Sequence, residues 1–538
     1  MKLFADLLER LVFTNSRNEK LRLLATYFRE APDPDRGWAV AAIAGTLDTR
    51  TVTPSIVRKL TEARVDPVLF RHSYDYVGDL AQTVSLIWQG QRTTEPVSLD
   101  KVVSRLRSAH RSEIAPLLES LLDCLGESER FALLKLATGG LRVGVSARML
   151  KLALASFGDK APEEIEELWF GLKPPYCALF AWLEGRAPAP AVDRTLLFRP
   201  AMLAHPLDAE TLARLDPADF IAEWKWDGIR VQALSFDGKR RLYTRTGDDI
   251  GHAFPDILES MTWEGVIDGE LLVVEDETVR PFHRLQKRLG RKAPSARAIA
   301  ENPARIRAYD LLELPGADLR PQPFAIRRQR LEEWASANPL SRFDLSSVFP
   351  VETWQQIDAL RERSRSGGYE GLMLKRRDSP YLAGRVKGHW FKWKREPLTA
   401  DCVLMYAQRG HGKRSSYYSD FTFGCWQEGA ESAGPRLVPV GKAYSGFTNA
   451  ELLELDKFVR ANTTERFGPV RAVTPDLVIE VAFDALQPSS RHKSGVAMRF
   501  PRIKRIRWDK PAAEADSLTT LSALRDMPMA DQKQQSLL

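Results

Sequence analysis

A lysine with unusual neighbours marks residues 221–232, IAEWKWDGIRVQ, where Lys225 precedes Asp227, Gly228 and Arg230. A lysine amine that loses its proton can attack phosphorus, and attack on a nucleoside triphosphate gives a lysine–nucleotide phosphoramidate. Neighbouring cations, desolvation or a metal ion would lower the amine's pKa from its ordinary value of about 10.4. Gly228 permits close backbone approach, and Arg230 offers a forked donor for phosphate oxygens. Taken alone, K-x-D-G also fits a surface turn in which Lys225 and Asp227 are solvated.

Carboxylates and cations that could complete such a site follow later in the chain. Glu270 in IDGE and Glu370 in YEGL stand at the ends of apolar, strand-like runs. Such a pair can hold Mg²⁺ or bond a ribose hydroxyl, whereas Asp268 is expected to shape a turn. Lys392 and Lys394 alternate in WFKWK, so a strand would point both to one face. Two ammonium groups on one phosphate would stabilise the charge that develops there and help keep the reactive lysine neutral.

Seven short stretches occur in a fixed order between Glu223 and Arg507: EWKWDGIR, YTRTGDDI, GVIDGELLV, RAYDLL, EGLMLKR, WFKWKR and MRFPRIKRIR. Together they closely resemble the motifs of the ATP-dependent DNA ligases. These enzymes belong to the covalent nucleotidyltransferase superfamily, with the RNA ligases and mRNA capping enzymes. The chain is most similar to the three-domain bacterial and archaeal type. Each stretch alone is a weak signal, but seven in the same order are a strong one.

The resemblance implies a set of ATP or AMP contacts: Glu223, Arg230, Arg245, Glu270, Tyr309, Lys392, Lys394, Arg499 and Arg502. Within this set, Tyr309 resembles the aromatic residue that stacks on adenine, and Glu223 the residue that helps to select adenine. Arg245 resembles a ribose and phosphate contact. Because an isolated tyrosine in an apolar strand is usually a core residue, these roles depend on the whole set of motifs.

The same resemblance assigns the reaction centre. Lys225 is implied as the catalytic nucleophile that carries AMP. Glu270 and Glu370 are the two candidate ligands of Mg²⁺. The resemblance also assigns the ribose to Glu270, whereas it assigns only the metal to Glu370. ATP and Mg²⁺ are therefore the expected cofactors.

Motif VI, MRFPRIKRIR, lies far along the chain from the lysine. Its Arg499 and Arg502 resemble the arginines that grip the β and γ phosphates, which requires the domain that bears them to close over the nucleotide. The segment REPL, 395–398, is the natural hinge. Lys442 in VPVGKAYSGFT is a further candidate for a DNA or phosphate contact.

Hydrophobic periodicity and turn residues divide the chain into four parts. Residues 1–190 carry apolar residues at helical spacing and are expected to form an all-α DNA-binding domain, which ends in the proline- and alanine-rich linker 184–194. Residues 195–396 alternate short strands with helices, as an α+β nucleotidyltransferase (adenylation) domain would. Within it, Asp237-Gly238 predicts a hairpin turn, WEGVIDGELLVV a strand pair or strand–turn–strand, and PFHRLQKRLG a short helix that ends at Gly290. Residues 397–510 predict strands around one helix, which fits an OB-fold β-barrel. Residues 511–538 are expected to be a flexible tail.

A glycine-rich joint at 133–155, LLKLATGGLRVGVSARMLKLALA, resembles part of the helical DNA-binding domain of larger ATP-dependent ligases. Gly139, Gly140 and Gly144 permit close backbone approach there. Ser146 is a good N-cap for the following helix, so backbone N–H groups with Arg142 could bind a DNA phosphate. The alternative is an ordinary joint between two helices.

Composition leaves several functions open and disfavours others. Lys and Arg outnumber Asp and Glu by 78 to 71, a net charge of +7, which permits a polyanionic partner without requiring one. The 4 cysteines are scattered, which argues against a disulfide framework or a structural zinc site. Neither a signal peptide nor an apolar run long enough to span a membrane is evident. A monomer in the reducing cytoplasm, associated with the bacterial nucleoid, is expected.

These features predict an ATP-dependent DNA ligase that seals 3′-hydroxyl/5′-phosphate nicks in duplex DNA through lysyl-AMP and adenylated DNA. DNA repair is the expected pathway, and replication and recombination are alternatives. Three other functions remain open. NAD-dependent ligation is disfavoured, because those enzymes resemble this chain only in the central domain and carry a four-cysteine zinc site that it lacks. RNA ligation or capping is disfavoured by the large helical N-terminal region, which most such enzymes do not have. A catalytically dead DNA clamp would have lost a motif residue.

Overall fold

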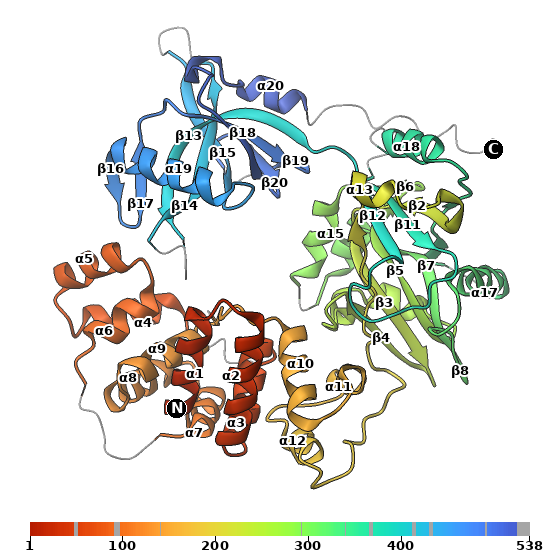
Figure 1. Cartoon of the computed structure of the whole chain (residues 1–538), viewed down its shortest axis with the longest axis horizontal. Coiled ribbons are helices and arrows are strands. Elements are labelled where there is room, and N and C mark those ends of the chain that lie inside the picture. The colour runs from red at the N-terminus through yellow and green to blue at the C-terminus, as the bar shows by residue number, and fades with distance from the viewer. Residues whose placement is uncertain are drawn as a thin grey trace. The chain divides into compact units, whose positions relative to one another are not determined.

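The computed structural model describes residues 1–47, 52–90, 97–139, 141–291, 293–338, 341–364, 369–410, 416–429, 434–489 and 492–524 (Figure 1). The chain divides into two compact units, of which one is Asp193–Pro397 and the other comprises Met1–Val192 and Leu398–Arg525. The second unit holds two separate hydrophobic cores, one among helices and one among strands. Each helix within the described ranges is too short or too polar to cross a lipid bilayer.

The N-terminal part is helical, as predicted. The apolar residues of its first helix lie at helical spacing and are buried on one face, as Phe4, Leu7, Leu8 and Leu11 show. Side-chain caps begin several of the helices: Ser16, for example, accepts a hydrogen bond from the N–H of Glu19. The helices are α1 (Lys2–Phe13), α2 (Arg17–Glu30), α3 (Asp35–Ala44), α4 (Pro54–Glu62), α5 (Pro67–Val77), α6 (Leu80–Ile87), α7 (Leu99–Ser108), α8 (Ile114–Cys124), α9 (Glu127–Ala137), α10 (Ala147–Gly158), α11 (Pro162–Trp169) and α12 (Cys177–Leu183).

The middle unit mixes strands and helices. Its strands are β1 (His205–Pro206), β2 (Phe220–Trp224), β3 (Ile229–Phe236), β4 (Lys239–Thr244), β5 (Gly265–Glu275), β6 (Thr278–Val279), β7 (Ala304–Leu314), β8 (Ala317–Asp318), β9 (Phe343–Leu345), β10 (Val348–Phe349), β11 (Gly371–Arg376) and β12 (Trp390–Lys394). Its helices are α13 (Ala209–Leu212), η1 (Pro217–Asp219), η2 (Gly251–Ala253), α14 (Pro255–Ser260), α15 (Phe282–Leu289), α16 (Ala296–Glu301), α17 (Phe324–Ala337) and α18 (Trp354–Arg363).

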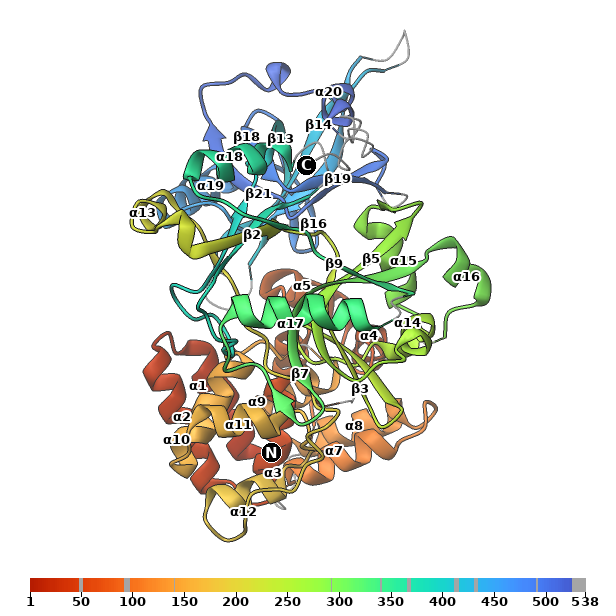
Figure 2. The same ribbon diagram turned by 90° about the vertical axis from the view of Figure 1, so that its right-hand side faces the viewer.

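Two sheets organise this unit. One has the order β1-β12-β11-β2-β10, and the other has the order β4-β3-β5-β7-β8 with β6 beside β5 and β9 beside β7. The pairs β1–β12 and β7–β9 are parallel, and the remaining pairs are antiparallel. Helix α17 packs against β7 (Figure 2). The unit is therefore an α+β domain, as the alternation of strand and helix patterns predicts.

Local signals located several elements correctly. Asp237 and Gly238, both with positive φ, form the predicted tight turn between β3 and β4. The helix expected before Gly290 is α15. The stretch GVIDGELLV is instead one continuous strand, β5, where the sequence suggested a strand pair or a strand–turn–strand. Because β5 is buried on both faces, it has no polar–apolar alternation to reveal its length.

The C-terminal part is β-rich around one helix. Strand β13 pairs with β14 along one edge and with β18 and β17 along the other. A register shift near Leu404 and Tyr406 marks an irregularity in the β13–β14 pair, where such a strand can bend. The elements are β13 (Leu398–Arg409), β14 (Tyr418–Gln427), β15 (Arg436–Ala443), α19 (Asn449–Ala461), β16 (Thr463–Phe467), β17 (Val470–Val473), β18 (Val478–Phe483), β19 (Ala485–Pro488), β20 (Val496–Arg499), β21 (Arg502–Arg507), η4 (Ala512–Glu514) and α20 (Leu518–Ala523).

The predicted fold class is confirmed: a helical N-terminal region, an α+β middle domain and a β-rich C-terminal domain. The prediction that residues 511–538 form a tail is wrong for 511–524. There Leu521 is buried in the β-rich core, and the Trp426 indole N–H donates to the backbone oxygen of Ala512 at 2.6 Å. The polar composition of this segment hid a short helix that buries one leucine. Residues 525–538 lie outside the described part.

Replacing Leu521 with alanine tests this packing. The side chain is 0% exposed, so its truncation leaves a cavity and is expected to lower the free energy of unfolding by about 2–4 kcal/mol. Calorimetric unfolding of the full chain measures the loss. Thr519→Ala, at an exposed position of the same helix, is the control. If Leu521→Ala unfolds with the control, α20 does not stabilise the β-rich domain.

Candidate functional site

Strand register gathers polar groups on one face of the sheet β1-β12-β11-β2-β10. Across β2 and β11, Glu223 lies opposite Met373 and Ile221 opposite Lys375. Side chains alternate along strands, so one face carries Glu223, Lys375, Lys392 and Lys394, followed by Lys225 just beyond β2. The opposite face is buried in an apolar core that contains Trp224, Leu372, Leu374 and Phe391. This core specifies the register that brings the charged groups together.

Lys225 lies one residue beyond the end of β2, and main-chain bonds hold it. Its N–H donates to the oxygen of Gly371 at 2.8 Å, and its own oxygen accepts from the N–H of Glu370 at 3.0 Å. Its Nζ lies 2.5 Å from Oε2 of Glu370, and Lys394 Nζ lies 3.4 Å from the same oxygen. One carboxylate thus contacts two ammonium groups. The structure therefore brings together Lys225, Glu370 and Lys394, as the sequence predicted.

Further cations converge on this point. Burial lowers the pKa of Lys392, and the positive charges of Arg385, Lys394 and Lys225 lower it further. Lys392 thus joins the cluster, as predicted from its alternation with Lys394. Sequence reasoning missed Arg385, which lies in an exposed position between Gly384 and β12. An arginine in a glycine-flanked loop gives little local signal, and only the fold places it near Lys392.

Glu270 lies among the same charges. Burial raises its pKa to about 8, Lys225 and Arg230 oppose the shift, and Glu370 and Asp227 add to it. The described residues contain no group of three His, Cys, Asp or Glu placed to hold a metal ion. Mg²⁺ is often held by one or two carboxylates with phosphate oxygens and water completing its shell. Glu270 and Glu370 fit such an ion only together with a bound nucleotide.

Gly228, three residues after the lysine, packs against β5. A β-carbon at this position would lie 2.3 Å from the oxygen of Leu271 and 2.9 Å from Cγ of Glu270. A larger residue would collide with the main chain of β5 at Leu271 unless the strand moved. The close approach expected of Gly228 is therefore made to the protein's own strand that carries Glu270.

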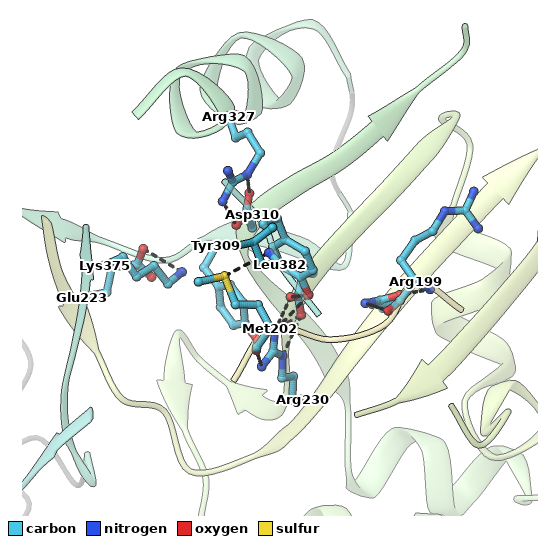
Figure 3. Close-up of polar contacts among 12 residues, drawn as sticks. Arg199, Met202, Glu223, Arg230, Tyr309, Asp310, Arg327, Lys375 and Leu382 are labelled. Carbon is cyan, nitrogen blue, oxygen red and sulfur yellow. Dashed lines mark hydrogen bonds and ion pairs between the residues drawn. The ribbon is translucent and has the colours of Figure 1, made fainter. Parts of the chain in front are cut away.

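A buried ion pair lies farther along β2 and β11. Lys375 Nζ is 3.1 Å from Oε1 of Glu223, and each side chain is 2% exposed. The amine also lies 4.1 Å from the centre of the Tyr309 ring and 4.6 Å from that of Trp390. Figure 3 shows Lys375 with Glu223 and Tyr309. Among the described residues, neither Lys375 Nζ nor Glu223 Oε1 makes a hydrogen bond of good geometry. Two buried polar atoms in this state are suited to bond a ligand. Sequence reasoning gave Lys375 no role.

A buried carboxylate, that of Asp268, holds the hydroxyl of Tyr309. Its hydroxyl donates to Oδ1 of Asp268 at 3.1 Å, and the Tyr381 hydroxyl donates to Oδ2 at 2.6 Å. Burial raises the pKa of the Tyr309 hydroxyl, so it remains a neutral donor. Asp268 is 0% exposed in the middle of β5. The prediction that Asp268 shapes a turn is therefore wrong.

Arg230 also belongs to this network. Its Nε and Nη2 donate to the two oxygens of Asp268 at 3.0 and 2.6 Å. Its Nη1 donates to the oxygen of Met202 at 2.6 Å, and Nη2 also donates to the Tyr381 hydroxyl at 3.1 Å. The fork expected to bind phosphate is occupied by a protein carboxylate. Arg230 lies near Tyr309 in this structure, and its nucleotide contact remains a prediction (Figure 3).

Three predicted nucleotide contacts lie elsewhere. Arg245 is exposed in the turn after β4, at the edge of the second sheet. Arg499 ends β20 and Arg502 begins β21, both in the other compact unit. There Arg502 Nη1 donates to Oδ1 of Asp484 at 3.1 Å. The nucleotide contacts of these arginines remain predictions.

The predicted DNA contacts are also spread over the second unit. Arg142 is exposed before α10, and Gly144 has a φ of +65°. The predicted N-cap is present, because Ser146 accepts a hydrogen bond from the N–H of Met149 at 3.2 Å. Lys442 is paired with Asp420 at 2.9 Å on the β-rich domain. Gly140 lies outside the described residues, and the DNA-binding roles remain predictions.

The partly buried carboxyl group of Glu270 predicts a pH-dependent stability. With a folded-state pKa of about 8 and an ordinary value of 4.5, the folded chain keeps a proton that the unfolded chain has already released. The free energy of unfolding must therefore fall as the pH rises between these values. Glu270→Gln should remove this slope and be more stable than the wild type at pH 8.5 by about 2–4 kcal/mol.

Urea unfolding of both proteins at pH 5 and pH 8.5 measures this slope. Glu259→Gln, which replaces an exposed carboxylate of the same domain, controls for the general effect of removing a charge. Equal pH slopes for the wild type and Glu270→Gln would show that Glu270 titrates normally.

Domain families of known proteins match most of the chain. DNA ligase N terminus matches residues 1–155, ATP dependent DNA ligase domain matches 201–394, and ATP dependent DNA ligase C terminal region matches 414–510. The middle match spans the sheet that carries Lys225, Glu370, Lys392 and Lys394. All three parts of the chain are thus similar to parts of one enzyme class.

Relatives that match the chain over almost its whole length are also named DNA ligases. A probable DNA ligase of Koribacter versatilis is 31% identical, over 96% of this chain and 95% of that protein. A probable DNA ligase of Streptomyces avermitilis is 31% identical, over 95% and 96%. DNA ligase 1 of Korarchaeum cryptofilum is 28% identical, over 96% and 97%. The solved structure Pmar-Lig_Pre. shares the fold, with a TM-score of 0.64 and 17% identity over 94% of this chain and 99% of that one. The chain belongs to the ATP-dependent DNA ligase family.

Proposed function

We propose that this ATP-dependent DNA ligase seals 3′-hydroxyl/5′-phosphate nicks in duplex DNA through an AMP adduct on Lys225. The observation that carries the proposal is the 2.5 Å contact between Lys225 Nζ and Glu370, on the sheet face that also bears Lys392 and Lys394. Two ammonium groups on one carboxylate, with a third on the same face of the sheet, suit a site for a phosphate-rich substrate. Lys225 stands out among them because it follows β2 directly and precedes the tight approach at Gly228.

In the first step, Lys225 Nζ attacks the α-phosphorus of ATP. An N–P bond forms, the bond between the α-phosphorus and the bridging oxygen breaks, and pyrophosphate leaves with the electron pair. The amine attacks after its proton has passed to solvent. The positive charges of Lys392 and Lys394 stabilise the negative charge that builds up on the phosphate. A bound Mg²⁺, held by Glu370 and Glu270 with nucleotide phosphates, would add charge neutralisation.

Two further transfers complete the reaction. The 5′-phosphate at the nick attacks the AMP phosphorus, the N–P bond breaks, and Lys225 regains a proton. The 3′-hydroxyl then attacks the activated 5′-phosphate, and AMP leaves as the phosphodiester bond forms. Positioning and electrostatic stabilisation account for most of the catalysis in such phosphoryl transfers. Lys225 accepts the nucleotide and releases it, so the third step does not use it as a nucleophile.

The buried pair Glu223 and Lys375 is suited to read the adenine base. Glu223 can accept from the exocyclic amine of adenine, a donor that guanine replaces with an oxygen acceptor. Lys375 can donate to a ring nitrogen, and Tyr309 offers a ring for stacking. Asp268 keeps that ring in place through its hydrogen bond to the hydroxyl.

The outer domains would complete the site. Arg499 and Arg502 are proposed to bind the β and γ phosphates when the β-rich domain closes through the segment 395–398. Arg142, Gly144 and Lys442 are proposed to contact DNA phosphates, so binding should weaken with salt and be indifferent to sequence. Lys442 would have to exchange Asp420 for a phosphate. Arg245 is proposed to reach the nucleotide from the turn after β4.

The cellular role is proposed to be DNA repair by a monomer in the bacterial cytoplasm, close to the nucleoid. The compact domain organisation predicted from the sequence supports this role over replication or recombination. Deleting the gene should then raise sensitivity to DNA-damaging agents without slowing undamaged growth. A growth defect in undamaged cells would favour a role in replication.

An inactive DNA-binding clamp is the alternative of a different class. It would require a missing nucleophile or carboxylate, yet Lys225, Glu270 and Glu370 are all present and near one another. Adenylation of the purified protein separates the two.

Lys225→Ala is expected to abolish adenylation and nick sealing with ATP, because the side chain that accepts AMP is lost. The measurement is transfer of label from α-labelled ATP to the protein, followed by sealing of a nicked duplex. Lys239→Ala, an exposed lysine of β4, should leave both intact. Nick sealing by Lys225→Ala starting from ATP would overturn the proposed function, and parallel assays with NAD, GTP and RNA nicks would identify the true substrates.

Glu223→Gln is expected to reduce the preference for ATP over GTP by about 10- to 100-fold. A glutamine amide can turn its NH₂ towards the guanine oxygen, whereas the carboxylate repels it. Rates of lysyl-nucleotide formation with each labelled triphosphate give the ratio, and Glu259→Gln is the matched control. An unchanged ratio would show that Glu223 does not read the base.

A further inference from the structure

Trp226, the residue after Lys225, anchors a link that is in neither a helix nor a strand. Residues 225–228 join β2 to β3 without regular structure. Trp226 is nevertheless 7% exposed and lies in the apolar core on the side of the sheet away from the cations. The two neighbours therefore point in opposite directions, one to the charged site and one to the core.

Three contacts hold the indole of Trp226. Its Nε1–H donates to Oγ of Ser346 at 3.1 Å. The guanidinium of Arg307 lies 4.2 Å from the centre of the ring, and an ion pair with Asp344 at 2.7 Å holds that arginine. The ring of Tyr369 meets the indole edge-on, with centroids 4.9 Å apart at 77°. Hydrogen-bonding, cation–π and aromatic contacts together leave the ring few alternative positions.

Tyr369 links this anchor to the other half of the ion pair. It stacks on Trp224 with centroids 4.6 Å apart at 24°, so it contacts both tryptophans that flank Lys225. It also directly precedes Glu370, whose carboxylate lies 2.5 Å from Lys225 Nζ. Trp224 and Trp226 therefore pack with Tyr369 on the apolar side of the sheet. On the opposite side, Lys225 pairs with Glu370.

We propose that Trp226 is a positioning residue for the adenylation step. By fixing the main chain on the C-terminal side of Lys225, it sets the position of Nζ for in-line attack on the α-phosphorus, and it does not touch the substrate. The inference rests on the proposed function of Lys225. A nucleophile misplaced by about 1 Å can lose about 100-fold in rate, so loss of the anchor should affect chemistry more than binding.

Trp226→Ala is expected to slow single-turnover formation of lysyl-AMP by about 10- to 100-fold. Its affinity for ATP and its rate of sealing a pre-adenylated nick should stay close to those of the wild type, because neither requires Lys225 to attack. Trp226→Phe keeps a ring against Tyr369 and Arg307 but loses the bond to Ser346, so it should recover most of the adenylation rate. Circular dichroism at the assay temperature reports the folded fraction of each protein.

Trp334→Ala is the matched control, because Trp334 is also 7% exposed and packs edge-on against Trp263 in a different core of the same domain. It should lower stability without changing the adenylation rate of the folded fraction. Three outcomes would overturn the proposal: an unchanged adenylation rate in Trp226→Ala, an equal fall in adenylation and in sealing of the pre-adenylated nick, or an equal effect of Trp334→Ala. Adenylation of Lys225→Ala would instead refute the proposed function, and the two failures are therefore distinguishable.

Discussion

The contact between one carboxylate and two ammonium groups is the interaction on which the site depends. Oε2 of Glu370 lies 2.5 Å from Lys225 Nζ and 3.4 Å from Lys394 Nζ. It forms only if β2, β11 and β12 keep their register, because a slip of one residue would turn Lys394 to the opposite face. The apolar core behind the sheet prevents such a slip, since Trp224 and its neighbours are buried there. Burial of aromatic residues is thus what holds three cations close together against their mutual repulsion.

A second carboxylate has a complementary role between the two sheets. Asp268 accepts hydrogen bonds from Arg230, Tyr309 and Tyr381, and it is 0% exposed. Its charge is matched by the bidentate Arg230, so the network is both neutral and well satisfied. Removing one partner would leave a buried charge uncompensated, which is strongly destabilising. The hydrogen-bonded network therefore holds the ring of Tyr309, which is proposed to stack on the base. Glu223 and Lys375, near that ring, retain the capacity to bond a ligand.

Much of the site was predictable because its signals are local. Alternation in WFKWK places Lys392 and Lys394 on one face, the Asp237–Gly238 turn fixes a hairpin, and the seven motifs identify Lys225 and Glu370. The contacts that the sequence did not reveal join distant segments. Nothing near Arg230 in sequence shows that β3 pairs with β5 and brings Asp268 within reach of its guanidinium. Nothing in the sequence assigns Lys375 to the site, because its burial against Tyr309 and Trp390 depends on how three strands pack.

Peptide mapping by mass spectrometry after incubation with ATP and Mg²⁺ is the most direct test of the central claim, that register and a shared carboxylate single out one amine among several on this face. The account predicts a single AMP on the peptide that contains Lys225, with none on Lys375, Lys392 or Lys394. An AMP on one of those other lysines, or on none, would contradict it.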